Sequence, residues 1–166
     1  MDEESNTMLC EQILGKLGHM DCGTKAVEYV DIEWHEAFKK IHKKVTDKGR
    51  EVGIRMDDSV LTRGLFQDDV IYEDEELVIA VNTPPCEVIA VSFTPGHEHM
   101  TAKACYEIGN RHAPLFWGDE ANTFITIYNE PMLVMLSKMH GVVAEKKMAK
   151  LDFDRRISAA IHNHHH

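Results

Sequence analysis

The sequence predicts an α+β fold in two domains, the first mostly β and the second mixed. Alternation of apolar and polar residues recurs through the first half, which is typical of half-buried strands. The pattern stops at Thr83-Pro84-Pro85, because proline has no place in a central strand. Strand-like and helix-like segments follow this stop, which indicates a second domain with helices packed on a sheet.

The regular structure of the first domain begins at residues 27–32, whose alternation predicts a strand. Apolar residues within 34–45 follow a helical period, and Asp31 is available as their N-cap. However, a turn signal at residues 47–49 and renewed alternation at residues 51–56 indicate a β-hairpin in the same region. We therefore expect a short helical turn followed by a strand.

Two β-rich apolar runs, residues 70–72 and 77–81, complete the first domain. The four acidic residues between them, 73–76, resemble a cation site, but a solvated hairpin tip is the favoured interpretation. We place this mostly-β domain at residues 1–85, with residues 1–12 as an N-terminal extension.

The second domain, residues 86–160, shows segments in the order strand, helix, strand, strand, helix, strand. This is the βαββαβ plan of ferredoxin-like domains. Proline opens both helices, and Gly141 is the expected C-cap of the second. Three methionines in the second helix could be soft-metal ligands, but core filling is the favoured interpretation. The expected segments are residues 87–93, 94–111, 115–117, 123–128, 130–141 and 142–151.

The composition is that of a globular protein, with 43% hydrophobic and 28% charged residues in a chain of 166. The formal net charge of −10 belongs to the first part, since residues 1–93 contain 10 Lys and Arg against 20 Asp and Glu. Such a chain lacks the basic surface that nucleic acids and anionic membranes require. We therefore expect neither as a partner.

The location expected from the sequence is cytoplasmic. No apolar stretch approaches the roughly 20 residues that a membrane span needs, and the acidic start is unlike a secretory signal. The four cysteines show no CxxC spacing, so we expect reduced thiols rather than a disulfide framework. They are Cys10, Cys22, Cys86 and Cys105.

Histidine is the unusual residue type, with 11 in the chain and four in the last five positions. We expect residues 161–166 to form a flexible tail whose imidazoles converge on one borderline metal ion. An expression tag, or truncation within a longer His-rich tail, would also explain the run, although Asn163 interrupts it. The candidate ligands are His162, His164, His165 and His166.

A further candidate ligand is His112, which lies within CYEIGNRHAPL at residues 105–115. Gly109-Asn110 loosens the end of the preceding helix, and Pro114 prevents that helix from continuing. His112 is therefore expected at an exposed corner between a helix and a strand. A lone histidine is more often structural than a ligand, so the corner alone does not assign a metal.

The stretch CYEIGNRHAPLFWG, residues 105–118, resembles the UreE family of urease accessory proteins, which are nickel metallochaperones. GNRH followed by a small residue and proline is its most specific part. Further blocks occur in the family's order, and the resemblance covers nearly everything from about Ile13 to the tail. These blocks are VEYVDIEW at 27–34, GREVGIRM at 49–56, DDVIYEDEELVIAV at 68–81 and KLD at 150–152.

The resemblance implies a homodimer in which an N-terminal β domain contacts partners and a C-terminal domain binds metal. It assigns nickel binding at the dimer interface to His112, supplemented by tail histidines such as His162 and His164. The implied cargo is Ni(II), with Zn(II) or Cu(II) able to compete in vitro. The implied partners are the urease accessory GTPase and the urease apoprotein complex, and the implied protein is not an enzyme.

Two other functions remain open from the sequence. A metallohydrolase would need a general base beside its metal, yet there is no HExxH motif and no carboxylate placed next to His112. A metal-free interaction module of ferredoxin-like fold would make the His-rich tail a tag.

The HEH motif at residues 97–99 departs from the family pattern and is a candidate auxiliary metal site. In a helix its two rings would point about 200° apart, so one ion would bind both only at an irregular turn. His35 and His42 are expected to be solvated or packing residues. Cys105 is expected to be a buried, inert thiol.

Overall fold

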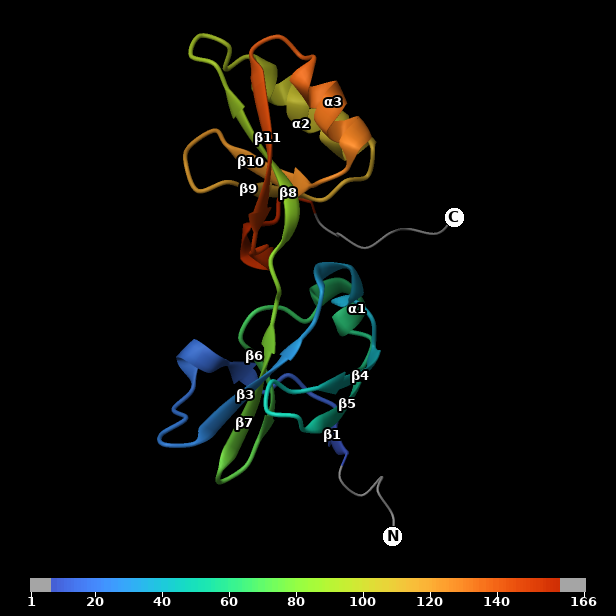
Figure 1. Cartoon of the computed structure of the whole chain (residues 1–166), viewed down its shortest axis with the longest axis vertical. Coiled ribbons are helices and arrows are strands. Elements are labelled where there is room, and N and C mark those ends of the chain that lie inside the picture. The colour runs from blue at the N-terminus through green and yellow to red at the C-terminus, as the bar shows by residue number, and fades with distance from the viewer. Residues whose placement is uncertain (1–6, 159–166) are drawn as a thin grey trace. The chain divides into compact units, whose positions relative to one another are not determined.

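The computed structural model describes residues 7–158, and the chain divides into two units, Met1–Pro84 and Pro85–His166 (Figure 1). Each unit has its own sheet structure and its own buried apolar residues. The boundary falls within the proline pair, where neither residue has a backbone N–H to donate to a strand. No helix within residues 7–158 is long and apolar enough to span a membrane.

The N-terminal unit is built from two small sheets. The first has the order β1-β5-β4, with β1 (Met8–Cys10) parallel and β4 (Ile41–Val45) antiparallel to β5 (Glu51–Arg55). The second has the order β2-β6-β7-β3, with β3 and β7 parallel. Its strands are β2 (Gly15–Lys16), β3 (Ala26–Asp31), β6 (Asp69–Glu73) and β7 (Leu77–Asn82). The helical turns of this unit are η2 (Leu17–His19), η3 (Trp34–Glu36) and α1 (Val60–Arg63).

The helical period in residues 34–45 yields only the single turn η3, because residues 41–45 are paired in the strand β4. β4 pairs with β5 over five residues, and these hydrogen bonds satisfy the backbone in an extended conformation. The hairpin expected around residues 47–49 is therefore confirmed. The expected N-cap is wrong: Glu33, not Asp31, precedes the turn, and the Glu33 N–H donates to the Glu36 carboxylate at 3.1 Å.

The segment expected to be an extension, residues 1–12, contributes to the fold where it is described. Its strand β1 pairs with Val52–Ile54 of β5. Cys10, the last residue of β1, is only 2% exposed, and burial raises the pKa of its thiol to about 11. The thiol is therefore protonated at neutral pH and serves as a small apolar side chain.

A buried carboxylate joins the two sheets of the N-terminal unit. Glu28 on β3 is 5% exposed, and it accepts hydrogen bonds from Arg50 Nε and Nη2, both at 3.1 Å, and from Thr46 Oγ1 at 2.7 Å. Arg50 and Thr46 lie at the turn between β4 and β5, which belong to the other sheet. The Arg50 hydrogen bonds hold the pKa of Glu28 below its usual value, against the opposing effect of burial.

The C-terminal unit is one antiparallel sheet with two helices. Its elements follow the βαββαβ order that the sequence predicts, and the strand order is β11-β8-β10-β9. β8 and β11 pair over eight residues, which makes this the longest pairing among the described strands. The elements are β8 (Cys86–Phe93), α2 (Met100–Asn110), β9 (Leu115–Trp117), β10 (Phe124–Ile127), α3 (Glu130–Ser137), β11 (Val142–Ala149) and the turn η4 (Phe153–Arg155).

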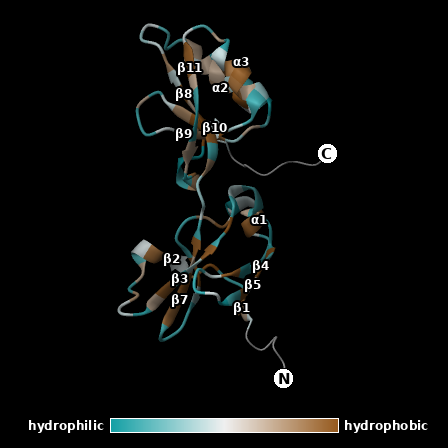
Figure 2. Ribbon diagram, viewed as in Figure 1, coloured by the Kyte–Doolittle hydropathy of each residue, from teal (hydrophilic) through white to brown (hydrophobic). Residues whose placement is uncertain are grey.

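The core of this unit lies between the sheet and its two helices. Figure 2 shows apolar residues gathered along α2 and α3, with hydrophilic residues in the connecting loops. Met132 and Leu136 of α3 are buried, and Met135 and Met139 pack against the same cluster, so core filling by the methionines is confirmed. The buried cluster consists of Ile89, Val91, Ala104, Ile108, Leu115, Phe124, Met132, Leu136 and Val142.

Both helices of the C-terminal unit are shorter than expected. α2 begins at Met100 rather than at Thr94, because Gly96 has a φ of 89°, which a right-handed helix does not allow. α3 ends at Ser137, with Lys138 and not Gly141 as its C-cap. Gly141 has a φ of 80° and forms the turn that leads directly into β11.

Replacing Glu28 with Gln should lower the free energy of unfolding by roughly 1–3 kcal/mol at pH 7, because a charged hydrogen-bond acceptor is lost from a buried site. A carboxyl whose pKa is lowered by folding stabilises the protein above its unfolded pKa, about 4.3 for Glu, and loses this effect as pH falls through the folded pKa. The difference between wild type and variant should therefore shrink below about pH 4.

Urea unfolding of both proteins at several pH values measures this difference. Glu51→Gln, at an exposed position of β5, is the matched control and should have little effect. A destabilisation by Glu28→Gln that does not change with pH would contradict the assigned role of the carboxylate.

Candidate metal centre

His112 follows Arg111, the C-cap of α2, at the exposed helix-to-strand corner that the sequence predicts. Its φ of 59° places it in the left-handed region, which few residues other than glycine occupy. The His112 N–H donates to the Gly109 carbonyl at 2.9 Å, and the Ala113 N–H donates to the Ile108 carbonyl at 3.3 Å. This is the Schellman arrangement that ends a helix, with histidine at the position where glycine is usual.

The backbone on both sides of His112 is held firmly. Before it, the Arg111 guanidinium donates to the Glu107 carboxylate at 2.6 Å and to the Glu107 carbonyl at 3.0 Å. After it, the buried Thr126 hydroxyl of β10 donates to the Pro114 carbonyl at 2.6 Å. The imidazole is therefore presented to solvent from a fixed backbone, which suits a ligand that must meet a metal in a defined place.

Two large aromatic side chains are exposed on the elements that His112 connects. Tyr106 of α2 is 66% exposed and Trp117 of β9 is 53% exposed. Large apolar side chains exposed singly are ordinary on a protein surface, so these two do not by themselves define a contact surface.

The other predicted ligands are not brought to His112 within the described residues. Residues 7–158 contain no group of three His, Cys, Asp or Glu side chains arranged to hold a metal ion. The tail candidates lie outside the described part of the chain. A metal at His112 would therefore need ligands from the tail or from another molecule. These tail candidates are His162, His164, His165 and His166.

The acidic residues 73–76 form the tip of the β6–β7 hairpin, as the favoured interpretation expected. Asp74 Oδ1 accepts hydrogen bonds from the N–H groups of Glu76 and Leu77, both at 2.8 Å, so it closes the turn. Glu73 is paired with Lys25 at 2.7 Å. Glu73 and Asp74 thus make contacts within the fold. The side chains of Glu75 and Glu76 are exposed on the tip.

The structure also describes His42, His35 and the Cys105 thiol of α2, for which the sequence predicted no metal-binding role. His42 is buried, its Nε2 donates to the Lys39 carbonyl at 2.9 Å, and burial lowers its pKa, so it is a packing residue. Exposed His35 contacts Trp34 edge to face. Burial raises the pKa of the half-buried Cys105 thiol, which keeps it in its unreactive form.

The HEH motif behaves differently from a helical pair. His97 and His99 precede α2 instead of lying within it, and their rings stack with centroids 6.0 Å apart. His140, from the loop before β11, contacts His97 with ring centroids 4.7 Å apart. Sequence reasoning found the first two and missed His140, which is 41 residues away from His99 in the chain.

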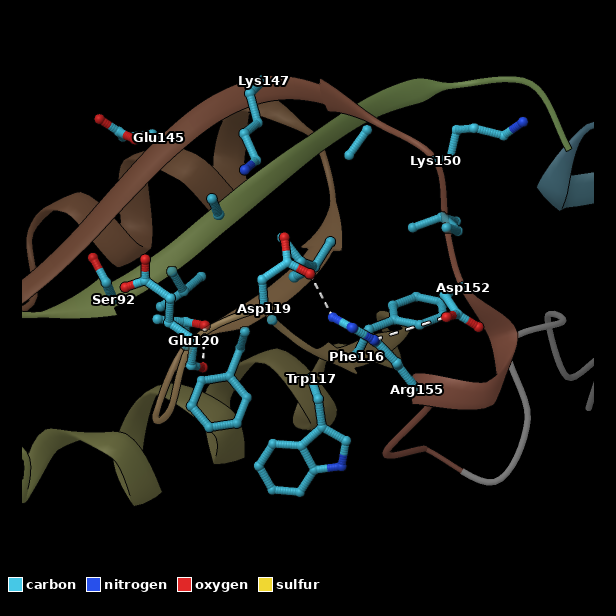
Figure 3. A pocket seen from close by; sticks show the side chains of 18 residues that line it. Ser92, Phe116, Trp117, Asp119, Glu120, Glu145, Lys147, Lys150, Asp152 and Arg155 are labelled. Atoms are coloured by element: carbon cyan, nitrogen blue, oxygen red, sulfur yellow. Dashed lines mark hydrogen bonds and ion pairs between the residues drawn. The ribbon is translucent and has the colours of Figure 1, made fainter.

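A cavity of about 480 Å³ in the C-terminal unit was also not anticipated from the sequence. It lies beside β8, β9, β10 and β11, and Figure 3 shows Asp119 and Arg155 facing one another within it. Arg155 pairs with Asp119 at 2.5 Å and approaches Asp152 at 3.8 Å. The guanidinium is thus neutralised by two carboxylates, so the site is not a ready binding place for an anion.

Comparison with known proteins gives consistent results. Residues 10–83 match the family described as UreE urease accessory protein, N-terminal domain. The urease accessory protein UreE of Helicobacter pylori strain G27 is 37% identical over 154 residues, which cover 93% of this chain and 88% of that protein. The chain belongs to the UreE family of urease accessory proteins.

Other UreE proteins support the same assignment. The one from Helicobacter acinonychis is 37% identical over 157 residues, covering 94% of this chain and 90% of its own length. The one from Acetivibrio thermocellus is 39% identical over 145 residues, covering 87% and 89%. UreE proteins are accessory proteins by name and not enzymes, which confirms that prediction.

Replacing His112 with Gly in this UreE protein should raise the free energy of unfolding by about 1 kcal/mol, because left-handed backbone costs an L-residue roughly that much. His112→Ala keeps the Cβ atom and is the matched control, with no comparable gain expected. Urea unfolding in the presence of a chelator compares the two variants without metal. Equal stability of the Gly and Ala variants would contradict backbone strain at this position.

Proposed function

We propose that this UreE protein carries Ni(II) and delivers it for assembly of the urease active site. The observation that carries the proposal is His112, an exposed imidazole held in left-handed backbone at the end of α2. Residues kept in such unfavourable conformations cluster at functional sites, where the surrounding structure maintains them. Membership in a family of urease accessory proteins supports the same role.

The chemistry of His112 suits a cargo site. Imidazole is a good ligand for nickel, and one His112 from each of two protomers would place two imidazoles on a twofold axis. We propose that the protein is a homodimer joined at this corner. Because such a site is incomplete, ligands of a receiving protein can enter the coordination sphere and take the ion.

The His-rich tail completes the proposed site. His162 and His164 to His166 would supply further imidazoles at a high effective concentration, and each of them can leave separately. Zn(II) and Cu(II) would compete in vitro, and the Irving–Williams order places copper above nickel. Selectivity in the cytoplasm, the proposed location, would then come from metal supply and from partners.

We assign partner binding to the acidic N-terminal unit. The proposed partners are the urease accessory GTPase and the urease apoprotein complex. Electrostatic attraction between exposed carboxylates and a basic partner speeds association and weakens with salt, because the Debye length is about 8 Å at physiological ionic strength.

His112→Ala should abolish tight nickel binding, which we expect at one ion per dimer, and leave weaker binding by the tail. The dimer should remain, because an exposed histidine is not a core residue. Calorimetric titration with Ni(II) measures the stoichiometry, and sedimentation measures the dimer.

His35→Ala, at an exposed histidine of the N-terminal unit, is the matched control and should leave nickel binding unchanged. Tight binding that survives His112→Ala would refute the assignment. Loss of all nickel binding on removal of the tail would instead favour a metal-free interaction module.

Neutralising the hairpin tip with Glu75→Gln and Glu76→Gln should slow association with the urease accessory GTPase at low salt and leave nickel affinity unchanged. Asp74 is left in place because it closes the turn. Stopped-flow mixing at two salt concentrations measures the rate. Glu120→Gln with Glu145→Gln removes the same charge from the C-terminal unit, and an equal effect of that control would exclude a local role for the tip.

A further inference from the structure

Three histidines from two separate loops meet at one end of the C-terminal unit. His97 and His99 lie in the loop between β8 and α2, and His140 lies in the loop between α3 and β11. The His97 ring is central: its centroid is 6.0 Å from that of His99 and 4.7 Å from that of His140. We call this group the three-histidine cluster.

The fold itself brings these loops together. Phe93 and Val142 are partners in the β8–β11 pairing, so the loops that follow β8 and precede β11 start side by side. The Thr94 N–H then donates to the Gly141 carbonyl at 2.9 Å. The closeness of His97 and His140 thus depends on backbone hydrogen bonds rather than on flexible side chains alone.

The backbone also makes room for the His97 ring. A Cβ atom at position 141 would come within 2.4 Å of His97 Cγ, so only glycine fits beside this ring. Gly141 additionally has a φ of 80°, which a residue with a side chain rarely adopts. The absence of a side chain at Gly141 therefore provides the space that the His97 ring occupies.

One polar atom in the cluster has no partner. Nδ1 of His97 is buried, and no hydrogen-bonding group within the described residues satisfies it. A buried polar atom without a partner lowers stability, and native proteins rarely retain one without a reason such as an ion. The atom lies in the same cluster as two more imidazoles, which are the side chains that a metal ion would recruit.

We propose that the three-histidine cluster is a second metal site, which binds a divalent ion of the zinc class through three imidazoles and leaves one position open. Two imidazoles on one such ion have ring centroids about 5 Å apart, given metal–nitrogen distances near 2.0 Å. The two centroid separations lie on either side of that value. As the side chains lie, no three of them within residues 7–158 are arranged to hold an ion, so the proposed site closes only when the exposed His99 and His140 side chains rotate toward His97.

The proposed site is separate from the one at His112. The cluster precedes α2 and His112 follows it, and a helix of 11 residues is about 16 Å long. One ion cannot reach both ends. Glu98, between the two histidines of the motif, accepts a hydrogen bond from the Gly96 N–H at 3.0 Å and supports the loop instead.

The test uses the full-length chain with His112→Ala and with asparagine in place of the four tail histidines, so that the cluster is isolated from the cargo site. Calorimetric titration with zinc chloride should show one ion bound per chain. His99→Asn or His140→Asn should each weaken binding at least about tenfold, a change of about 1.4 kcal/mol. Imidazole NMR signals of His97, His99 and His140 should shift on zinc addition.

His35→Asn is the matched control for an exposed histidine elsewhere and should leave zinc affinity unchanged. His97→Phe keeps a ring beside Gly141 but removes both nitrogens, so zinc should no longer raise its melting temperature. The proposal is overturned if the chain that lacks His112 and the tail histidines takes up no zinc at millimolar concentration. It is also overturned if adding His99→Asn or His140→Asn to that chain leaves its zinc affinity unchanged. Because His112 is absent throughout, neither result bears on the nickel site.

Discussion

The antiparallel pairing of β8 with β11 is the interaction on which the C-terminal unit depends. It joins the first and last strands of the unit over eight residues, although they are separated by two helices and two strands. At the Phe93–Val142 end it brings together the loops that carry His97 and His140. α2 then runs across the sheet and presents His112 at its other end. The ladder therefore positions His97 and His140, whereas the Thr126–Pro114 hydrogen bond from β10 holds the backbone beside His112.

Histidine occupies unfavourable surroundings at both ends of α2. His112 has left-handed backbone, and Nδ1 of His97 is buried without a partner among the described residues. Each feature lowers stability, and each is maintained by firm neighbours: the Thr126–Pro114 hydrogen bond on one side and Gly141 on the other. Such local costs persist where a rigid framework imposes them, and metal binding is the role that we propose for both histidines.

Several acidic side chains of the N-terminal unit are paired with basic or N–H groups of the same unit. Buried Asp69 accepts two hydrogen bonds from the Arg63 guanidinium and one from the Phe66 N–H. Glu28 accepts from Arg50, and Glu36 pairs with Lys44 at 2.6 Å. The number of acidic residues in the sequence therefore overstates how many carboxylates are free to meet a partner. The exposed side chains at residues 75–76 of the hairpin tip are among those that remain available.

The sequence by itself determined the order of elements in the C-terminal unit and the corner at His112. These follow from signals a few residues long, such as Gly109-Asn110 before the corner and Pro114 after it, which act through backbone conformation. Only the tertiary structure decided that the helical turn stops at Glu36 before the expected strand, and that His140 joins the HEH motif. The first outcome follows from the pairing of β4 with β5, and the second from a hydrogen bond between Thr94 and Gly141, 47 residues apart in the chain, which no local pattern encodes.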